Sequence, residues 1–337
     1  MIPGLENMSL ASLANSCCLP SSKMALLRDR AQMLRCSRRF FDERGLLEVD
    51  TPLLCRYPCV DAHIDLFHVE TNEGRRWLHS SPEYVMKRLL CEGMSDIYQI
   101  SHVFRFGEAG RWHNPEFTMV EWYRNHRDLE LLIAEVADFI SLFLGERSVA
   151  IYPYHALFAR YVGIDLESCS YQELVDLLID KEPQLAPSLA DGSWQRDALL
   201  QLLMHQLIEP HLGSNEYSIV VDWPATQAAL AQVVPSEHYD CSVAKRFELF
   251  ADGIELANGY LELRDPEEHR RRWVMANELK VADGKLPLPL DEPFLELLAE
   301  KELPECCGVA VGFDRLMMMR HRVDSIERIL PYSWRQV

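Results

Sequence analysis

Residues 103–124 hold the side chains best suited to bind a nucleotide. Their sequence, VFRFGEAGRWHNPEFTMVEWYR, predicts two strands joined by a long polar loop. Arg105 ends the first strand, and alternation places Phe117 and Glu121 on one face of the second. An aromatic ring can stack on a base while a guanidinium binds a phosphate. A hairpin with a solvated loop would give the same pattern, so the segment alone leaves both interpretations open.

A second segment, residues 253–265, carries candidate metal ligands. In its sequence, GIELANGYLELRD, Glu255 and Glu262 stand seven residues apart with Asn258 between them. Two carboxylates and an amide near a tight turn suit a hard divalent cation that phosphate oxygens also bind. A turn between polar strand residues is the alternative interpretation of this segment.

A third segment, residues 308–319, predicts a strand of small residues followed by a helix. Its sequence is GVAVGFDRLMMM, and Arg315 stands at the start of the helix. Small residues on a strand let a ligand approach the backbone closely. The alternative is a core strand that ends in an N-capping Asp314. One glycine pattern of this kind is weak evidence by itself.

The hydrophobic patterns outline the elements that must position these segments. A helix is predicted to begin after Ser21 or Ser22 and end at Gly45, and Ser81-Pro82-Glu83 is typical of another helix start. Further strands are predicted at 46–54, 64–69, 96–105, 117–124, 217–221, 247–251, 254–263 and 308–313, with helices after Asp128, through most of 150–215 and after Asp265. Strands outnumber βαβ units, which favours an α+β fold with a largely antiparallel sheet.

No linker separates two independent domains in this pattern. We therefore expect one catalytic domain over residues 23–337, behind a loosely ordered leader at residues 1–22. The capping box formed by Ser170 and Glu173 supports a helix start within the middle of the chain.

The composition excludes several classes of protein. The 337 residues include 34 Lys and Arg against 52 Asp and Glu, a net charge of −18, which disfavours non-specific nucleic-acid binding. No apolar run approaches the ~18 residues that span a bilayer, and the first basic residue is Lys23, unlike the start of a signal peptide. The ten cysteines form no CxxC pair, so we expect reduced thiols, no zinc site and a cytoplasmic protein.

Taken together and in this order, the three segments resemble the motifs of the class II aminoacyl-tRNA synthetase catalytic domain, most closely its lysyl branch. Within that branch the chain is similar to the family of elongation factor P–(R)-β-lysine ligases. The similarity rests on SPEYVMKRLL (81–90), RWHNPEFTMVEWYR (111–124) and GIELANGYLEL (253–263), and RGLLEVDTPLL (44–54) resembles the dimer-interface motif 1. The resemblance extends over residues 23–335 and implies an antiparallel sheet of about six to seven strands flanked by helices.

The resemblance also implies a bound ATP that is attacked in line at its α-phosphate, giving a mixed anhydride. Arg105 would bind the α-phosphate and the substrate carboxylate, and Phe117 would stack on adenine. Arg315 would cover the other adenine face and neutralise the γ-phosphate. Glu255 and Glu262 would coordinate Mg²⁺. The implied ATP contacts are completed by Gly107, Glu108, His113, Asn114, Leu256 and Gly312. This catalysis works by positioning and charge neutralisation and needs no nucleophilic side chain.

For the amino acid, the resemblance brings Glu83, Glu121 and Glu262 into one pocket. Three carboxylates there would pair with two ammonium groups, so a diamino acid fits better than aspartate. The pocket would be completed by Ser81, Tyr123, Asn258 and Ala310. Ala257 and Ala310 stand where lysyl-tRNA synthetases have glycine, as in the β-lysine ligases, and suit a β-amino acid.

Two features depart from an ordinary lysyl-tRNA synthetase. Phe106-Gly107 stands where Asn-Glu is usual, and Glu108 follows one place later. Only about 22 residues precede the first helix, too few for an anticodon-binding OB-fold. We therefore expect no tRNA charging and an acceptor lysine on elongation factor P. The basic runs Arg38-Arg39, Arg75-Arg76 and Arg270-Arg271-Arg272 could dock such a partner or be solvated faces.

The main hypothesis is thus an ATP-dependent ligase that activates (R)-β-lysine and transfers it to the ε-amino group of a lysine on elongation factor P, acting as a homodimer. One alternative is a stand-alone class II ligase that uses α-lysine or another amino acid, such as an ammonia-using asparagine synthetase. The other alternative is a catalytically silent synthetase relative with a regulatory role, a possibility that Phe106-Gly107 keeps open.

Overall fold

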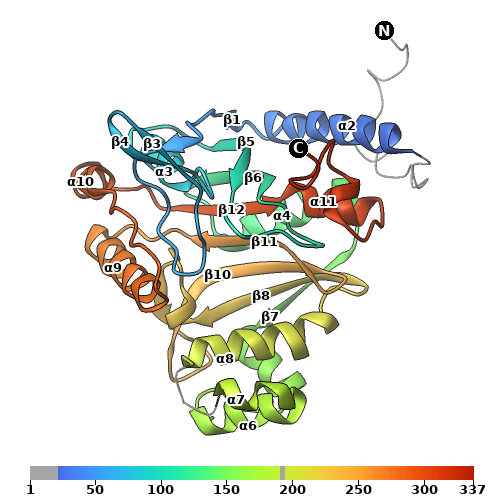
Figure 1. Cartoon of the computed structure of the whole chain (residues 1–337), viewed down its shortest axis with the longest axis vertical. Coiled ribbons are helices and arrows are strands. Elements are labelled where there is room, and N and C mark those ends of the chain that lie inside the picture. The colour runs from blue at the N-terminus through green and yellow to red at the C-terminus, as the bar shows by residue number, and fades with distance from the viewer. Residues whose placement is uncertain (1–21, 190–193) are drawn as a thin grey trace. The chain divides into compact units, whose positions relative to one another are not determined.

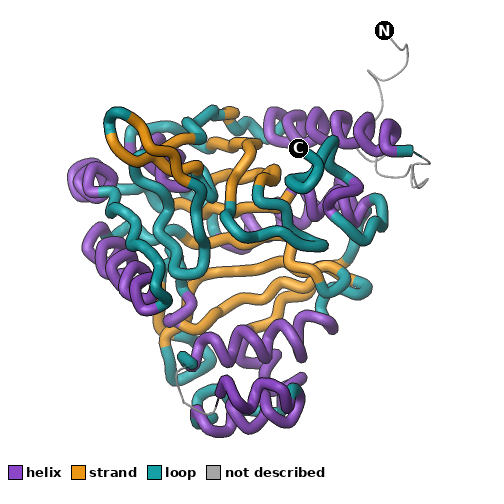
Figure 2. The backbone as a smooth tube through the Cα atoms, in the orientation of Figure 1, coloured by secondary structure: helices purple, strands orange, loops and turns teal. Residues whose placement is uncertain are grey.

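A computed structural model describes residues 22–189 and 194–337, so most of the predicted leader lies outside the described part. The chain divides into two compact units. The first unit comprises residues up to Glu146 together with Leu261–Val337, and the second unit comprises Arg147–Tyr260. The predicted single catalytic domain spans both units and stays a prediction. Figure 1 labels the elements and Figure 2 separates helices, strands and loops by colour.

The main sheet of the first unit is built mostly from antiparallel strands. Its strands run in the order β1 (Leu47–Glu48), β5 (Ile97–Phe104), β6 (Glu116–Asn125) and β12 (Cys306–Gly312). β6 pairs antiparallel with both β5 and β12, whereas the short β1 pairs parallel with β5. A smaller antiparallel sheet has the order β2 (Leu54–Cys55), β4 (Gly74–Leu78) and β3 (His68–Thr71).

One face of β6 is buried by aromatic side chains from two helices. Trp122 on β6 packs with Phe41 of α2 (Lys23–Asp42) and Phe139 of α4 (Leu129–Leu144), at ring-centroid distances of 5.1 and 5.5 Å. Because side chains alternate along a strand, this burial turns Glu121 and Tyr123 toward the opposite face. The apolar core thereby orients the polar side chains that matter for the site.

The remaining helices of the first unit are α3 (Glu83–Cys91), α9 (Pro266–Ala282), α10 (Glu292–Lys301), α11 (Phe313–Arg320) and the single turn η6 (Ile326–Arg328). α3 begins one residue later than the sequence predicts: Pro82 occupies the cap position instead of the first helical position, and the Ser81 hydroxyl accepts the N–H of Glu83 at 3.0 Å. No described helix is long and apolar enough to cross a membrane.

The second unit is a sheet covered by short helices. Its strands have the order β11 (Ile254–Leu261), β10 (Ser242–Ala251), β8 (Glu216–Pro224) and β7 (Ser148–Pro153), and β9 (Val233–Pro235) pairs with one end of β10. Its helical segments are α5 (Tyr154–Leu157), η1 (Phe158–Val162), α6 (Tyr171–Lys181), η2 (Pro183–Leu185), α7 (Ala186–Leu189), α8 (Arg196–Leu203), η3 (Met204–Ile208), η4 (Glu209–His211) and η5 (Ala225–Gln227).

These helices pack an apolar core against the sheet of the second unit. The core includes Phe158 and Leu199 from the helices and Trp223 and Phe250 from the strands. The predicted capping box is confirmed: Ser170 and Glu173 each bond the other's backbone N–H at the start of α6. The mixture of helices with mostly antiparallel strands confirms the α+β prediction, and the parallel pairs β1–β5 and β7–β8 are the exceptions.

A close backbone approach makes Gly213 a sensitive position. Its φ is +75°, and a Cβ there would lie 2.4 Å from the Ala251 Cα atom. Gly163 has a similar φ of +80°, but a Cβ there would meet nothing within 4 Å. A side chain at Gly163 would introduce backbone strain alone, whereas one at Gly213 would introduce both strain and steric overlap, so the two positions allow these effects to be compared within one unit.

We expect Gly213→Ala to lower the free energy of unfolding by about 3 kcal/mol or more, because strain and overlap add. The matched variant Gly163→Ala has strain alone and should cost about 1 kcal/mol. Urea unfolding followed by circular dichroism measures both. Equal losses in the two variants would contradict the steric argument.

Candidate active site

Arg105 lies where β5 meets the loop that returns the chain to β6. Its backbone N–H donates to the Pro115 carbonyl at 2.9 Å, which fixes the base of the loop. Its guanidinium carbon lies 5.2 Å from the centroid of the Phe117 ring and its Nη1 lies 3.8 Å from the Glu108 carboxylate. The Arg105 Nε is buried and has no hydrogen-bond partner. A guanidinium held against a ring with a spare donor is suited to an anionic oxygen.

Arg315 and His113 come together from distant parts of the sequence. The Arg315 Nη2 lies 2.8 Å from the His113 Nε2, although 202 residues separate them in the chain. Asp314 holds α11 in place, since its carboxylate accepts the backbone N–H of Thr118 at 2.7 Å and pairs with Arg30. Asp314 is therefore a tertiary anchor, and the alternative that it caps α11 is wrong, because Gly312 occupies the cap position.

The side chain of Asn114 ties the loop to the C-terminal segment. Its Nδ2 donates to the Glu116 carbonyl at 2.6 Å, and its Oδ1 accepts the backbone N–H of Trp334 at 3.0 Å. Both polar atoms are thus used within the protein. The predicted contact of Asn114 with the triphosphate stays a prediction, and the structure gives this residue a loop-shaping role.

The unusual dipeptide Phe106-Gly107 stands where a β-bridge between Phe106 and Asp65 gives way to an exposed turn at Gly107. The Phe106 side chain is 58% exposed, and its ring packs edge-on against Phe67 at 5.2 Å. Gly107 has φ +83°, a left-handed conformation that a residue with a side chain rarely adopts. The neighbouring Glu108 carboxylate lies near Arg105, so it is the acidic group that the loop brings to the predicted nucleotide contacts.

Glu121 is the buried centre of the predicted amino-acid pocket. It is 3% exposed, and its carboxylate accepts hydrogen bonds from the Ser81 hydroxyl and the Tyr123 hydroxyl, both at 2.7 Å. Burial, together with the nearby Glu83 carboxylate, raises the pKa of Glu121 to about 7. The structure therefore brings together Ser81, Glu121 and Tyr123, which the resemblance assigns to one pocket.

A lysine that the sequence analysis did not select lies beside the other two glutamates. The Lys87 Nζ lies 2.6 Å from a Glu83 oxygen and 2.6 Å from a Glu262 oxygen. The side chains of Lys87 and Glu262 are 0% and 1% exposed. Burial lowers the pKa of Lys87, but the Glu262 and Glu83 carboxylates outweigh it, so this pKa lies above its ordinary range. The spacing of Glu83 and Lys87, four residues apart on a predicted helix, was the available signal.

Gly308 shows why small residues are needed on β12. A Cβ at this position would lie 2.3 Å from a Glu262 oxygen and 2.4 Å from the Tyr123 ring. Gly312 has no such constraint, since a Cβ there would meet its nearest neighbour, the Arg315 side chain, at 3.8 Å. Ala310 lies directly opposite Glu121 in the register of β12 and β6. The strand of small residues thus borders the carboxylate pocket.

Three predicted site residues, Glu255, Leu256 and Asn258, lie on β11 and belong to the second unit. The Asn258 Nδ2 donates to the Glu248 carboxylate at 3.3 Å, and Glu248 also pairs with Arg246. Burial raises the pKa of Glu248 to about 8, although the Arg246 guanidinium opposes that shift. Neither Arg246 nor Glu248 was among the predicted site residues. Their alternation in RFELF, which puts two charges on one face of a strand, was the signal.

The predicted magnesium ligands fall in different units. Glu255 belongs to the second unit and Glu262 to the first, and the Glu262 carboxylate already contacts the Lys87 ammonium. Among the described residues, no three His, Cys, Asp or Glu side chains form a cluster that could hold a metal ion. The magnesium site stays a prediction.

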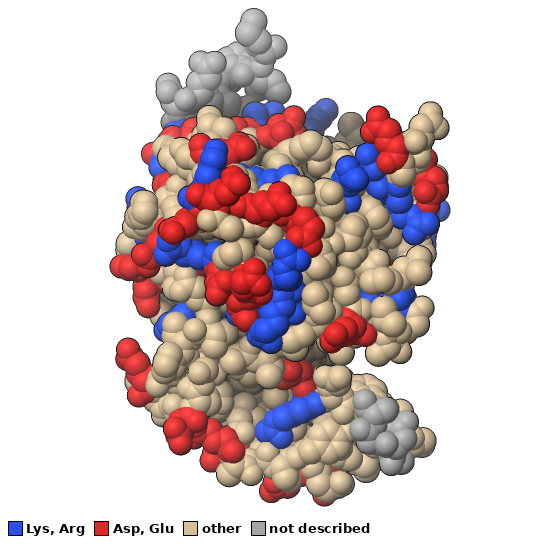
Figure 3. Space-filling model, turned by 90° about the vertical axis from the view of Figure 1, so that its left-hand side faces the viewer, with Lys and Arg blue, Asp and Glu red and all other residues tan. Residues whose placement is uncertain are grey.

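The arginine runs on the surface are neutralised by neighbouring carboxylates. Arg270 pairs with Glu292 at 2.6 Å, while Arg271 and Arg272 pair with Glu268 at 2.6 and 2.7 Å. The other two runs behave alike, with the pairs Arg38–Glu48, Arg39–Glu43, Arg75–Glu70 and Arg76–Glu73. Figure 3 shows one face of the molecule, where basic and acidic side chains are interspersed. The solvated-face interpretation fits these runs better than a basic docking surface.

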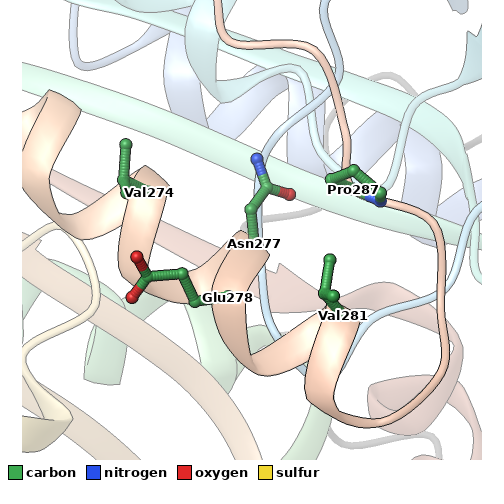
Figure 4. Close-up of a pocket in the computed structure, with 5 residues that line it drawn as sticks. All are labelled: Val274, Asn277, Glu278, Val281 and Pro287. Atoms are coloured by element: carbon green, nitrogen blue, oxygen red, sulfur yellow. The ribbon is translucent and has the colours of Figure 1, made fainter.

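A separate pocket of about 330 Å³ opens beside α9. It is lined by Val274, Asn277, Glu278, Val281 and Pro287, as Figure 4 shows. The pocket contains none of the predicted site residues. Its lining supplies few groups that could orient a polar substrate, so it is not the candidate active site.

Comparisons with known proteins decide the family. The family described as tRNA synthetases class II (D, K and N) matches residues 18–336, nearly the whole chain. The chain belongs to this family. A class II synthetase fold implies ATP as a substrate, and it confirms the fold that the three sequence segments predict.

Three curated relatives of this class II chain share the printed name elongation factor P–(R)-β-lysine ligase. The protein of that name from Sodalis glossinidius is 40% identical over 320 residues, which cover 93% of this chain and 96% of the relative. The one from Haemophilus ducreyi is 39% identical over 332 residues, or 97% and 99% of the two chains. A third, from Haemophilus influenzae strain PittGG, is 41% identical over 323 residues, or 93% and 96%. The resemblance to this ligase family is confirmed.

The raised pKa of Glu121 predicts a pH-dependent stability. The folded state keeps a proton on Glu121 up to about pH 7, whereas an unfolded glutamate releases it near pH 4.5. This group therefore lowers the stability progressively as the pH rises between these values. Relative to the wild type, Glu121→Gln should gain about 3 kcal/mol between pH 4.5 and pH 8, measured by urea unfolding. The exposed Glu73→Gln serves as control, and parallel pH curves for all three proteins would contradict the prediction.

Proposed function

We propose that this chain activates (R)-β-lysine with ATP and transfers it to the ε-amino group of a lysine on elongation factor P. The observation that carries the proposal is the buried carboxylate pocket of Glu83, Glu121 and Glu262 in the first unit. Buried carboxylates are costly unless they meet positive charge, so the pocket favours a substrate with more than one ammonium group. The named relatives support the same substrate.

In the first step, a substrate carboxylate oxygen attacks the α-phosphorus of ATP, and pyrophosphate leaves. Arg105 would bind the attacking carboxylate and the α-phosphate, with the Phe117 ring supporting its guanidinium and stacking on adenine. Arg315, held beside His113, would neutralise charge on the γ-phosphate. In the second step the acceptor amine attacks the carbonyl of the mixed anhydride, and AMP leaves. Both steps depend on alignment and charge neutralisation.

Magnesium would accompany ATP in this reaction. It would neutralise phosphate charge and hold the pyrophosphate in the leaving geometry. Glu255 is the partly exposed carboxylate that would bind it. Glu262 fits less well as a metal ligand, because Lys87 already lies 2.6 Å from its carboxylate.

Adenine and the side chain of the amino acid would be recognised by residues that differ from those of ordinary lysyl-tRNA synthetases. The Glu108 carboxylate would accept a hydrogen bond from the adenine amino group. It would do so in place of the glutamate that lysyl-tRNA synthetases usually have where Gly107 stands. Ala257 and Ala310 would suit a β-amino acid, and the resemblance alone assigns Asn258 to the amino acid. We also propose a cytoplasmic location, where a translation factor would be the acceptor.

A homodimer through the motif 1 region is part of the proposal. Leu47, Leu53 and Leu54 in this region are 53%, 40% and 42% exposed. Neighbouring exposed leucines are typical of a surface that another protein covers. β1 at this site is also an edge strand of only two residues.

Light scattering after size exclusion should therefore give twice the chain mass of 39.0 kDa. Leu54→Glu should shift the protein toward the monomer, because a carboxylate would be buried in the interface. Leu286→Glu, at a position that is 70% exposed outside this region, is the matched control. A wild-type monomer, or a Leu54→Glu dimer, would argue against the motif 1 interface.

The decisive experiment is ATP–pyrophosphate exchange with (R)-β-lysine, α-lysine and aspartate, followed by transfer to purified elongation factor P. We expect exchange to be strongest with (R)-β-lysine and absent with aspartate, which the carboxylates repel. Preference for α-lysine would keep the ligase but overturn the roles of Ala257 and Ala310. A folded protein without exchange would instead favour the regulatory alternative.

Arg315→Ala supplies the control within the site. Loss of its guanidinium should reduce exchange by about 100-fold or more while the thermal unfolding temperature stays close to that of the wild type. Undiminished exchange in this variant would refute its assigned role with ATP.

A further inference from the structure

The carboxylate pocket contains an internal positive charge. Three carboxylates, those of Glu83, Glu121 and Glu262, lie together in the first unit with the Lys87 ammonium. When all three carboxyl groups are ionised, as ammonium groups of a ligand beside them would favour, three negative charges and one positive charge give the group a net charge of −2. That value is equal and opposite to the charge of two ammonium groups.

Burying a lysine at position 87 costs free energy. Its side chain is completely buried, and so is that of Glu262, which it contacts. Desolvating a lysine costs several kcal/mol, and a buried ion pair is often no more stabilising than apolar residues of the same volume. Stability alone therefore gives little reason for a lysine here. A role in setting the charge of the pocket explains it.

The position of Lys87 suits such a role. It stands four residues after Glu83 on α3, so helix geometry brings the two side chains together without any tertiary contact. Its second partner, Glu262, reaches the same point from a segment 175 residues later in the chain. Gly308 leaves the room that Glu262 needs. Glu121 has hydroxyl partners instead, Ser81 and Tyr123.

We propose that Lys87 is a specificity-determining positioning residue that neutralises one of the three carboxylates and so adjusts the pocket to two ammonium groups. This inference rests on the proposed function. With a diamino acid bound, the charges of the pocket and of the two ammonium groups sum to zero, while the carboxylate of the ligand is assigned to Arg105. With an amino acid that lacks the second amine, one buried carboxylate stays uncompensated, which is the basis for rejecting it.

A double-variant cycle tests the charge count. Lys87→Met leaves a net charge of −3 and Glu262→Gln leaves −1, whereas the double variant returns to −2. We expect each single variant to bind (R)-β-lysine about tenfold or more weakly, because one unpaired charge stays in the complex. The double variant should bind within about threefold of the wild type.

The preference between ligands should follow the same count. 3-Aminohexanoic acid is (R)-β-lysine without its terminal amine. Glu262→Gln should lose most of the preference for (R)-β-lysine over this analogue, and adding Lys87→Met should restore the preference. A merely structural role for Lys87 would give a double variant at least as impaired as the worse single variant.

Lys280→Met is the matched control for removing a buried lysine. Lys280 is 2% exposed, donates to the Ile64 carbonyl at 2.6 Å and pairs with Asp65 at 3.3 Å, all in the first unit. This variant should lower the unfolding temperature as Lys87→Met does but leave the affinity and preference for (R)-β-lysine unchanged. A loss of preference in Lys280→Met would count against a specific role for Lys87.

The measurements are Kd by calorimetry and KM and kcat by exchange, all on the full chain. If the wild type binds (R)-β-lysine but catalyses no exchange, the proposed function is refuted. The Kd values of the two single variants and the double variant would still decide the role of Lys87. If the wild type catalyses exchange but the double variant does not regain affinity for (R)-β-lysine, only the role of Lys87 is refuted. Absence of binding by both ligands to the wild type would overturn both.

Discussion

The contact of the Lys87 ammonium with Glu83 and Glu262 is the interaction on which the first unit's polar interior depends. Without it, three carboxyl groups would share a space from which water is largely excluded, and a second carboxyl besides Glu121 would be driven to take up a proton. The rest of the unit accommodates this arrangement. A helix supplies the lysine, a glycine on β12 leaves room for Glu262, and two hydroxyl groups bind Glu121.

The register of β6 connects this interior to the nucleotide contacts. Its aromatic face packs on α2 and α4, so its polar face carries both Phe117 beside Arg105 and Glu121 beside Tyr123. A shift of one residue would exchange the two faces and lose both groups together. The predicted amino-acid contacts and the predicted nucleotide contacts therefore depend on the same strand pairing.

Much of this could be predicted from the sequence, since alternation on β6, the start of α3 and the small residues of β12 depend on local spacing. Lys87 offered only a weak local signal, its spacing from Glu83, because nothing local shows that Glu262 comes to the same point from far along the chain. Arg246 and Glu248 were missed for a related reason: a charged residue in a strand is ordinarily solvated, and only packing shows that Glu248 is buried and that Arg246 beside it is largely covered. The hydrogen bond from the Trp334 backbone N–H to the Asn114 side chain likewise depends on the tertiary fold.

The self-paired arginine runs have a consequence for kinetics. Each of these guanidiniums lies next to a carboxylate of the same chain, so the pair has almost no field beyond one Debye length. The long-range field is then set by the net charge of −18. An acidic partner would be repelled during its approach and captured only by short-range fit, so its association rate would rise with added salt, the reverse of an electrostatically steered encounter.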